Sequence, residues 1–597
     1  MLTVILTIHN TKKHMKKLST LFLACSLLLS SCQSAPTPIP TSSTTEKSET
    51  WIGEKFSGFS EKTLVTAKNY MISSADELAS KAGAEMLAQG GNAVDAAIAA
   101  QMVLNVVEPQ SSGIGGGLFL LYFDAKSKKS TSFNGRETAP LAAHEKIFLD
   151  KKGKVRSFND VVGGGLSVAT PGALKTLEAA HKKYGKLPWK NLFAPAIKIA
   201  NDGFVLDEKI HTVLIQLPYL SKFDGMKIYF DKTEPKEVGS IIKNPELAKT
   251  FSEIAAKGSK AFYQGKIAND IVNAVQTSKI NPGTLALTDL KKYKSKSGKL
   301  LCNKYRQKYK ICSMPGASGG ITLLQVLKIL ENFNLEKIKP SSIEAVHLIS
   351  EATRLAYADR SEYVADASNV PLKKMLNKSY IAKRAKLIKM DKAMGEVVAG
   401  NFDKKAKINK TQEKPSTTHI AIVDSEGNAV SMTSSIEYLF GSVLMVDGFM
   451  LNNQLTDFSL SPTVNGKLAA NRVQPGKQPR SSMSPTFVFD EKDNLIMTVG
   501  SPGGPRIIQF LTKTIVAVLD WKMDIQEAIS LPNHVILNDQ IELENRTSLT
   551  DLKPALEKMG HKVIITDITS GINGIVINDG RLEGGADPRR NGAAIGK

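Results

Sequence analysis

Thr417 stands where a polar, Lys-rich segment meets an apolar strand, and this junction limits the possible folds more than any other feature. Residues 400–416 have no apolar periodicity, which predicts an exposed linker. Residues 417–424 are largely apolar, and a turn at 425–428 separates them from a second predicted strand at 429–436. Cleavage between Ser416 and Thr417 would give Thr417 both a hydroxyl and an α-amine. Because an α-amine has a pKa of about 7.7–8.0, it could act as a general base, and the junction predicts a self-processing hydrolase.

Three motifs further along the chain decide how this junction is interpreted, because a Ser-Thr-Thr before a strand is most often an ordinary strand start. They are LNNQLTDF at 451–458, PRSSMSPT at 479–486 and GSPGGPR at 500–506. Together with TTH at 417–419 and TSSIEYLFGS at 433–442, they resemble the γ-glutamyltranspeptidase (glutathione hydrolase) family. The resemblance runs in family order from about residue 64 to the C-terminus.

The resemblance implies a fold and a division of the chain. It implies an α+β architecture, the N-terminal-nucleophile hydrolase αββα four-layer sandwich, formed by two autoprocessed subunits of the same chain. The large subunit would be residues 64–416, and the small catalytic subunit would be residues 417–597.

Local patterns predict individual elements of that architecture. Strands 118–123 and 130–133 are expected to pair, and Asn92 is expected to cap a helix of small residues. Ser341 and Glu344 form a possible capping box. Further helices are predicted at 76–88, 188–202, 320–332 and 344–358.

The first 63 residues are predicted to be a targeting segment and a tether, outside the fold. Residues 1–32 predict a signal peptide with a lipobox, in which Cys32 would be lipidated and become the first mature residue. An ordinary signal peptide or a short anchor is the alternative, and either Met1 or Met15 could be the start. Residues 33–63 predict a Pro/Ser/Thr tether. These features predict a bacterial lipoprotein, periplasmic or on the cell surface, held to the membrane only through its lipid.

Charge and cysteine content narrow the other possibilities. The chain has 78 basic and 57 acidic residues, a net charge of +21, but the lysines are dispersed and not interleaved with aromatic residues. This favours a solvated surface over nucleic-acid binding. The sequence has no CxxC or HExxH motif and its nine His are scattered, so neither a metal site nor a cofactor is expected. Cys302 and Cys312 flank a predicted turn and could be a disulfide or two buried thiols.

Acyl transfer needs a nucleophile and an oxyanion hole. Thr417 would be the nucleophile, and Ser435 would support it where many family members have Thr. By the resemblance, the backbone N–H groups of Gly503 and Gly504 form the oxyanion hole, which suits glycine because no side chain blocks the approach.

The resemblance also supplies a clamp for the α-carboxylate and α-ammonium of a γ-glutamyl donor. A carboxylate prefers a bidentate Arg with hydroxyls, and an ammonium prefers acceptors. The matching residues are Arg136, Ser481 and Ser482 for the carboxylate, and Gln454, Asp457 and Glu437 for the ammonium. Without the resemblance, Arg136 would be interpreted as a surface ion pair with Glu137. The short segment between Asp457 and Ser481 predicts a lid that is reduced or absent.

The implied reaction passes the γ-glutamyl group of glutathione and its conjugates to water or to amino acid or peptide acceptors through a γ-glutamyl-Thr417 ester. The motifs fit hydrolysis and transfer equally, and also a cephalosporin-acylase-like or poly-γ-glutamate specificity. One alternative is a serine hydrolase, since residues 316–320 match G-x-S-x-G between a predicted strand and a helix. A non-catalytic peptide-binding lipoprotein is the other alternative.

Overall fold

The computed structural model describes residues 59–367, 370–402, 416–464 and 466–597. These residues all belong to one unit of the chain, Ile52–Lys597. The predicted signal peptide, Cys32, most of the tether and residues 403–415 of the predicted linker lie outside the described residues.

Two antiparallel seven-stranded sheets form the centre of this unit. Sheet A contains, in spatial order, β1 (Val65–Ala67), β24 (Arg581–Ala586), β23 (Asn573–Asn578), β19 (Leu495–Gly500), β18 (Thr486–Phe489), β11 (Tyr309–Ser313) and β10 (Leu301–Tyr305). Sheet B contains, in spatial order, β25 (Ala593–Gly596), β2 (Met71–Ser74), β12 (Thr418–Val423), β13 (Ala429–Ser435), β3 (Gly117–Asp124), β4 (Lys129–Gly135) and β9 (Lys296–Gly298).

Both sheets mix strands from before and after Thr417. In sheet B, β12 and β13 lie between β2 and β3, with Ile420 opposite Ser74 and Ser435 opposite Gly117. Strand β12 is buried throughout, and its side chains alternate between the hydrophobic clusters on its two faces. Burial on both faces explains why residues 420–423 of this strand are all apolar and show no polar alternation. The two predicted subunits therefore share each sheet.

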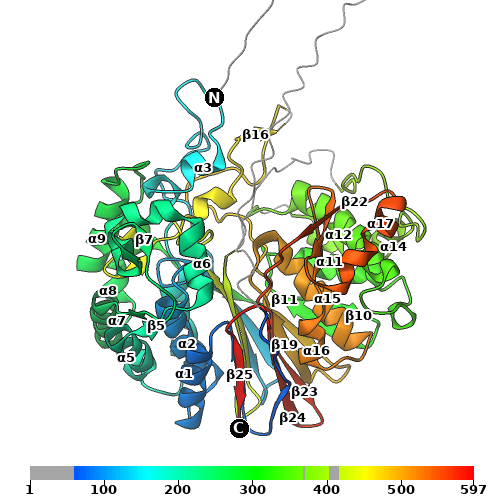
Figure 1. Cartoon of the computed structure of the whole chain (residues 1–597), viewed down its shortest axis with the longest axis horizontal. Coiled ribbons are helices and arrows are strands. Elements are labelled where there is room, and N and C mark those ends of the chain that lie inside the picture. Colours follow the sequence, from blue (N-terminus) through cyan, green and yellow to red (C-terminus); the bar gives the residue numbers. More distant parts are fainter. Residues whose placement is uncertain (1–58, 368–369, 403–415, 465) are drawn as a thin grey trace, which may run out of the picture. The chain divides into compact units, whose positions relative to one another are not determined.

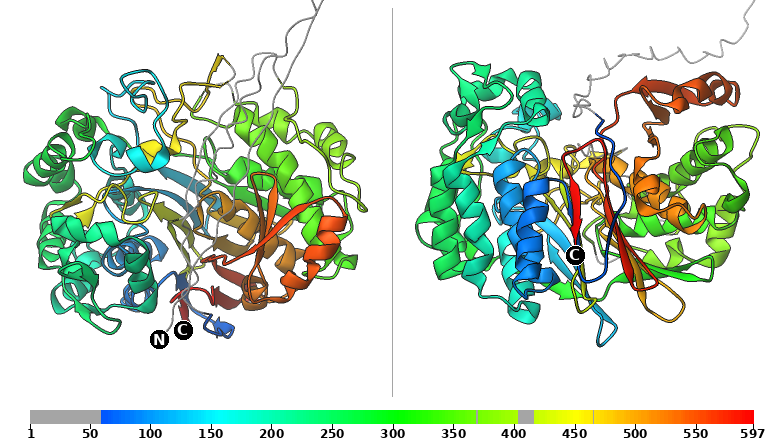
Figure 2. Two further views of the ribbon diagram at one scale, coloured as in Figure 1. Left: turned by 45° about the horizontal axis from the view of Figure 1, so that its top comes forward. Right: turned by 60° about the horizontal axis from the view of Figure 1, so that its bottom comes forward.

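Helices cover the outer faces of both sheets, as Figures 1 and 2 show. Helices that share a hydrophobic cluster with sheet B alone include α1 (Glu77–Ala88), α2 (Ala93–Val107), α4 (Ala173–Tyr184), α5 (Ala194–Asp202), α6 (Glu208–Gln216), α7 (Pro245–Lys257) and α9 (Lys266–Gln276). Those that share one with sheet A are α11 (Gly320–Leu330), α12 (Ile343–Tyr363), α14 (Lys378–Ala385), α15 (Ile507–Leu519) and α16 (Ile525–Ser530). The predicted order of helix, sheet, sheet and helix is confirmed.

Shorter elements complete the unit. The short helices are α3 (Phe158–Val161), α8 (Lys260–Tyr263), α10 (Leu287–Lys292), α13 (Leu372–Met375) and α17 (Lys553–Lys558). The remaining strands pair as β5 (Phe204–Val205) with β8 (Ile241–Ile242), β6 (Phe230–Asp231) with β7 (Glu234–Pro235), β14 (Met445–Val446) with β15 (Phe449–Met450), and β16 (Thr463–Val464) with β17 (Lys467–Leu468). A three-stranded sheet contains β20 (His534–Leu537), β21 (Gln540–Glu544) and β22 (Lys562–Thr566).

Of the predictions for helix starts, one is confirmed and two differ from the structure. Asn92 caps α2 in a full capping box with Asp95, as expected from its place before a helix of small residues. The capping box at Ser341 was wrong: Ser342 is the cap and accepts from the Ala345 N–H, while Ser341 has a φ of +56° outside the helix. Residues 189–193 of the predicted helix 188–202 form a 3₁₀ turn before α5.

Two further observations concern the cysteine pair and the possibility of a membrane-spanning helix. Cys302 and Cys312 are directly opposite each other in the β10–β11 hairpin and form a disulfide. Within the described ranges, none of the helices has the length and apolar character needed to cross a bilayer.

Candidate active site

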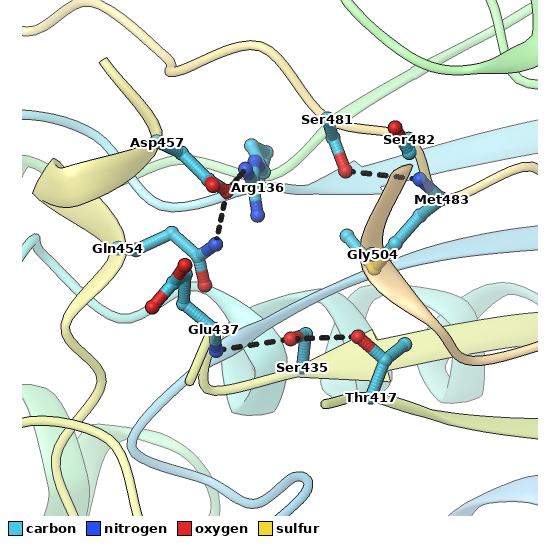
Figure 3. A pocket seen from close by; sticks show the side chains of 10 residues that line it. All are labelled: Arg136, Thr417, Ser435, Glu437, Gln454, Asp457, Ser481, Ser482, Met483 and Gly504. Atoms are coloured by element: carbon cyan, nitrogen blue, oxygen red, sulfur yellow. Dashed lines mark hydrogen bonds and ion pairs between the residues drawn. The ribbon is translucent and has the colours of Figure 1, made fainter. Parts of the chain in front are cut away.

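A small pocket lies where β12 begins and β13 ends, and ten residues line it (Figure 3). They are Arg136, Thr417, Ser435, Glu437, Gln454, Asp457, Ser481, Ser482, Met483 and Gly504. All except Met483 were predicted from the sequence; Gly503, also predicted, lies beside the pocket and is not among its lining residues. The space among these residues is about 260 Å³, part of which is open to solvent.

Thr417 and Ser435 are brought together by the pairing of their strands. Thr417 immediately precedes β12 and Ser435 ends β13, and Thr418 is opposite Ser434 in the sheet. The Thr417 hydroxyl donates to Ser435 Oγ at 3.0 Å, and Ser435 Oγ also accepts from the Glu437 N–H at 2.9 Å. Ser435 therefore fixes both the nucleophile candidate and Glu437, the second residue after β13.

The peptide bond between Ser416 and Thr417 is held in place by the glycine motif. The Ser416 carbonyl accepts from the Gly503 N–H at 3.3 Å, and the Ser416 hydroxyl donates to the Gln110 carbonyl at 2.9 Å. Gly503 has a φ of +127°, and a Cβ there would lie 2.7 Å from the Phe510 ring. Only glycine fits this position, which leaves its N–H directed at the carbonyl.

Thr417 itself has an unusual backbone. Its φ of +102° is rare for any residue with a Cβ and most costly for a β-branched one. Strain of this kind costs on the order of 1–3 kcal/mol and occurs mainly where the surrounding structure imposes it, often at functional sites.

Arg136 is buried and has several acceptors, which contradicts the surface ion pair expected without the family resemblance. It is 1% exposed, and Nη2 donates to Asp457 Oδ2 and to the Arg480 carbonyl at 2.9 Å. Nη1 donates to Glu137 Oε2 at 3.4 Å. These contacts hold the guanidinium rigidly at the end of β4.

Glu137 is the buried partner behind Arg136. Burial raises the pKa of its carboxyl to about 7, although the neighbouring Arg136 lowers it. A Cβ on Gly117 would lie 2.5 Å from Glu137 Oε2, so the carboxyl packs directly against the start of β3.

Three side chains with acceptor oxygens lie close to one another next to Arg136. Gln454 and Asp457 are the ends of one 3₁₀ turn, Gln454–Asp457, so both side chains face the pocket. Gln454 Nε2 donates to Asp457 Oδ2 at 2.6 Å, whereas Gln454 Oε1 is buried without a hydrogen-bond partner among the described residues. Glu437 lies beside them, 3% exposed and with a φ of +80° (Figure 3). This group offers acceptors to a buried cation.

Ser481 and Ser482 rest on the G-x-S-x-G segment, which explains that motif without a second nucleophile. The Ser481 N–H donates to the Ala317 carbonyl at 2.8 Å, and the Gly319 N–H donates to the Met483 carbonyl at 3.2 Å. Ser318 is fully buried and donates to the Met314 carbonyl at 2.5 Å. Its hydroxyl is therefore inaccessible, and the serine-hydrolase alternative is not supported.

His419 does not contribute a base to the pocket. It is fully buried, and its Nδ1 lies 2.9 Å from Thr433 Oγ1. Burial lowers the pKa of the imidazole to about 3. A Cβ on Gly500 would overlap the ring at 2.1 Å, so His419 fills the space between the two sheets.

Comparisons with known proteins show which family the chain resembles. The family model for gamma-glutamyltranspeptidase matches residues 79–597. The glutathione hydrolase proenzyme of Bacillus subtilis is 38% identical over 554 residues, covering 90% of this chain and 92% of that protein. The Escherichia coli proenzyme of the same name is 36% identical over 543 residues, covering 88% and 91%.

Solved structures of similar proteins also match this chain. The cephalosporin acylase of Bacillus halodurans has a TM-score of 0.78 at 25% identity, over 96% of this chain and 99% of that chain. The γ-glutamyltranspeptidase of Helicobacter pylori has a TM-score of 0.53 at 34% identity, over 58% of this chain and 99% of that chain.

Proposed function

The chain belongs to the γ-glutamyltranspeptidase family, and from this membership we propose that it is an N-terminal-nucleophile enzyme acting on glutathione. It cleaves the γ-glutamyl amide bond and passes the γ-glutamyl group to water or to the amine of an amino acid or peptide. The observation that carries the proposal is that one small pocket brings Thr417 together with a guanidinium, two serine hydroxyls and several acceptor oxygens.

These groups match the zwitterionic end of a γ-glutamyl group. Arg136, Ser481 and Ser482 supply donors for the α-carboxylate. Gln454 Oε1, which is buried and unpartnered, would accept from the α-ammonium together with Asp457 and Glu437. An unsatisfied buried acceptor is costly, so an ammonium that satisfies it gains affinity.

The chemistry would follow from the residues at the other end of the pocket. Thr417 Oγ1 attacks the γ-carbonyl carbon while the Thr417 α-amine takes the hydroxyl proton, and Gly503 and Gly504 N–H groups stabilise the oxyanion. The ammonium formed on Thr417 then protonates the departing cysteinylglycine amine as the C–N bond breaks. Water or an acceptor amine attacks the resulting ester, loses its proton to the α-amine and restores Thr417.

Self-cleavage would create that α-amine. The Thr417 hydroxyl adds to the Ser416 carbonyl carbon, the C–N bond breaks, and water hydrolyses the ester to a Ser416 carboxylate and a free Thr417. Two observations support this step: the Gly503 N–H already contacts the Ser416 carbonyl oxygen, and the positive φ of Thr417 is relieved when the bond breaks. Cleavage also releases the Gly503 N–H for the oxyanion of the substrate.

Thr417→Ala and Thr417→Ser test the proposal together. Wild type should yield a 181-residue fragment beginning at Thr417, seen by denaturing gel and N-terminal sequencing, and should release glutamate from glutathione. Thr417→Ala should remain one chain without activity, whereas Thr417→Ser should process and turn over more slowly. Cleavage of Thr417→Ala during refolding without protease would disprove the autocatalytic step.

We further propose that Cys32 carries a lipid anchor and that the enzyme lies in the periplasm or on the cell surface. The support is the lipobox pattern of residues 15–32, with a basic start and an apolar run. In cells, Cys32→Ser should move the enzyme from the membrane to the soluble fraction or block its maturation. Full membrane retention of that variant would show that another part of the protein binds the membrane.

A further inference from the structure

Helix α12 sends two side chains from one face to two different walls of the pocket. Tyr357 and Arg360 lie one turn apart, and the Arg360 guanidinium carbon is 5.9 Å from the centre of the Tyr357 ring. The Tyr357 hydroxyl donates to the Pro505 carbonyl, and Arg360 Nη2 donates to Ser482 Oγ at 2.9 Å. Neither residue lines the pocket itself.

The Tyr357 contact holds the loop that contains the oxyanion glycines. Gly503 and Gly504 have φ values of +127° and +55°, a region that glycine enters and leaves at little cost. Before cleavage, the hydrogen bond from the Gly503 N–H to the Ser416 carbonyl restrains the loop. After cleavage, that N–H can leave Ser416 for another acceptor. The Pro505 carbonyl, next to Gly504, accepts from Tyr357, and this contact does not involve the Ser416–Thr417 bond, so Tyr357 can hold the donors when substrate binds.

The Arg360 contact holds the carboxylate side of the pocket. A hydroxyl that accepts from a guanidinium has one lone pair direction fixed, which restricts the rotamer of Ser482. Arg360 also puts a positive charge behind Ser482, which favours a carboxylate in front of it. Arg360 is 3% exposed, so solvent screens that charge weakly.

We propose that α12 is a positioning helix in which Tyr357 sets the oxyanion donors and Arg360 sets the carboxylate-binding Ser482. This inference rests on the proposed function. It assigns separate kinetic effects to two residues one turn apart: Tyr357 acts on the transition state through kcat, and Arg360 acts on donor binding through KM.

The same helix provides matched controls. Tyr363 donates to the Gly400 carbonyl at 2.6 Å, and Arg354 donates to the Met394 carbonyl at 2.8 Å. These hydrogen bonds all go to the segment 394–400, which contributes no lining residue to the pocket. Removing the Tyr363 hydroxyl or the Arg354 guanidinium therefore makes the same chemical change in α12 as the test variants, but away from the pocket.

The experiment measures kcat and KM for a γ-glutamyl anilide with the processed enzymes, and the rise in Tm caused by L-glutamate. Tyr357→Phe should lower kcat about 10- to 100-fold with KM within about twofold, because small misplacement of a reacting group has effects of this size. Arg360→Met should raise KM about tenfold or more, reduce the glutamate-induced rise in Tm, and recover partly in Arg360→Lys. Tyr363→Phe and Arg354→Met should keep both kinetic parameters within about twofold of wild type.

The outcomes separate this inference from the proposed function. If Tyr357→Phe and Arg360→Met behave like their controls in a wild-type background that turns over, α12 does not position the site. A parallel fall of kcat in both variants with unchanged KM would also overturn the assignment. If Arg360→Met does not fold, an unchanged KM and glutamate response in Arg360→Lys, which cannot make the same fork, counts against it. Absence of turnover by wild type overturns the proposed function and this inference with it.

Discussion

Ser435→Ala tests how the strand pair sets up the nucleophile. The change removes the acceptor of two bonds, one from the Thr417 hydroxyl at 3.0 Å and one from the Glu437 N–H at 2.9 Å. Glu437 is 3% exposed, so its N–H would be left buried without that partner, at a cost of about 1–3 kcal/mol. If the arrangement in which Thr417 reacts is destabilised by this free energy, self-cleavage and turnover slow about 5- to 150-fold.

The assay follows the fraction of cleaved chain against time on a denaturing gel, and then kcat for a γ-glutamyl anilide. Ser435→Thr keeps the hydroxyl and should process and turn over close to wild type. Ser434→Ala is the matched control, because that hydroxyl lies in the same strand and donates to the Gly117 carbonyl at 3.2 Å, away from Thr417. Equal rates for Ser435→Ala and Ser434→Ala would refute a supporting role for Ser435.

Three further predictions concern the clamp. Arg136→Lys should still self-cleave but raise KM for glutathione by about 10- to 100-fold, because Lys lacks the planar guanidinium whose charge-assisted hydrogen bond to a carboxylate is worth roughly 1.5–3 kcal/mol; an unchanged KM would contradict the clamp. Glu437→Asn should lower the preference for γ-glutamyl over glutaryl anilides in kcat/KM, and should raise thermal stability by roughly 1 kcal/mol, since Asn tolerates a φ of +80° better; an unchanged preference would place Glu437 away from the ammonium. Glu137→Gln tests the raised carboxyl pKa of Glu137, about 7. The protonated carboxyl stabilises the folded state below about pH 4.5, and this stabilisation is lost as pH rises to 7, so the variant should gain stability relative to wild type across that interval by roughly 3 kcal/mol in total. Denaturant unfolding curves whose difference does not change with pH would contradict this prediction.

The sequence by itself determined the parts of this protein that depend on residue type and short spacing. The TTH junction, the Gln454 and Asp457 pair and the two serines at 481–482 could be recognised because each motif needs only a few neighbours. The cap at Asn92 and the hairpin at 118–133 could be predicted because they rest on local hydrogen bonds and alternation. Even here a one-residue error arose at Ser341, because neighbouring serines can compete for the same cap.

Only the tertiary structure decided which of these pieces meet. Arg136 pairs with Asp457 across 321 positions, and the Ser416 carbonyl meets Gly503 from a distant loop. The support of Ser482 by Arg360 and of Pro505 by Tyr357 has no local signal, since a buried helix shows the same pattern whether its polar side chains hold a site or another segment. Such contacts arise when two sheets built from both halves of the chain pack together. Their geometry depends on the packing of all layers at once, which no window of a few residues contains.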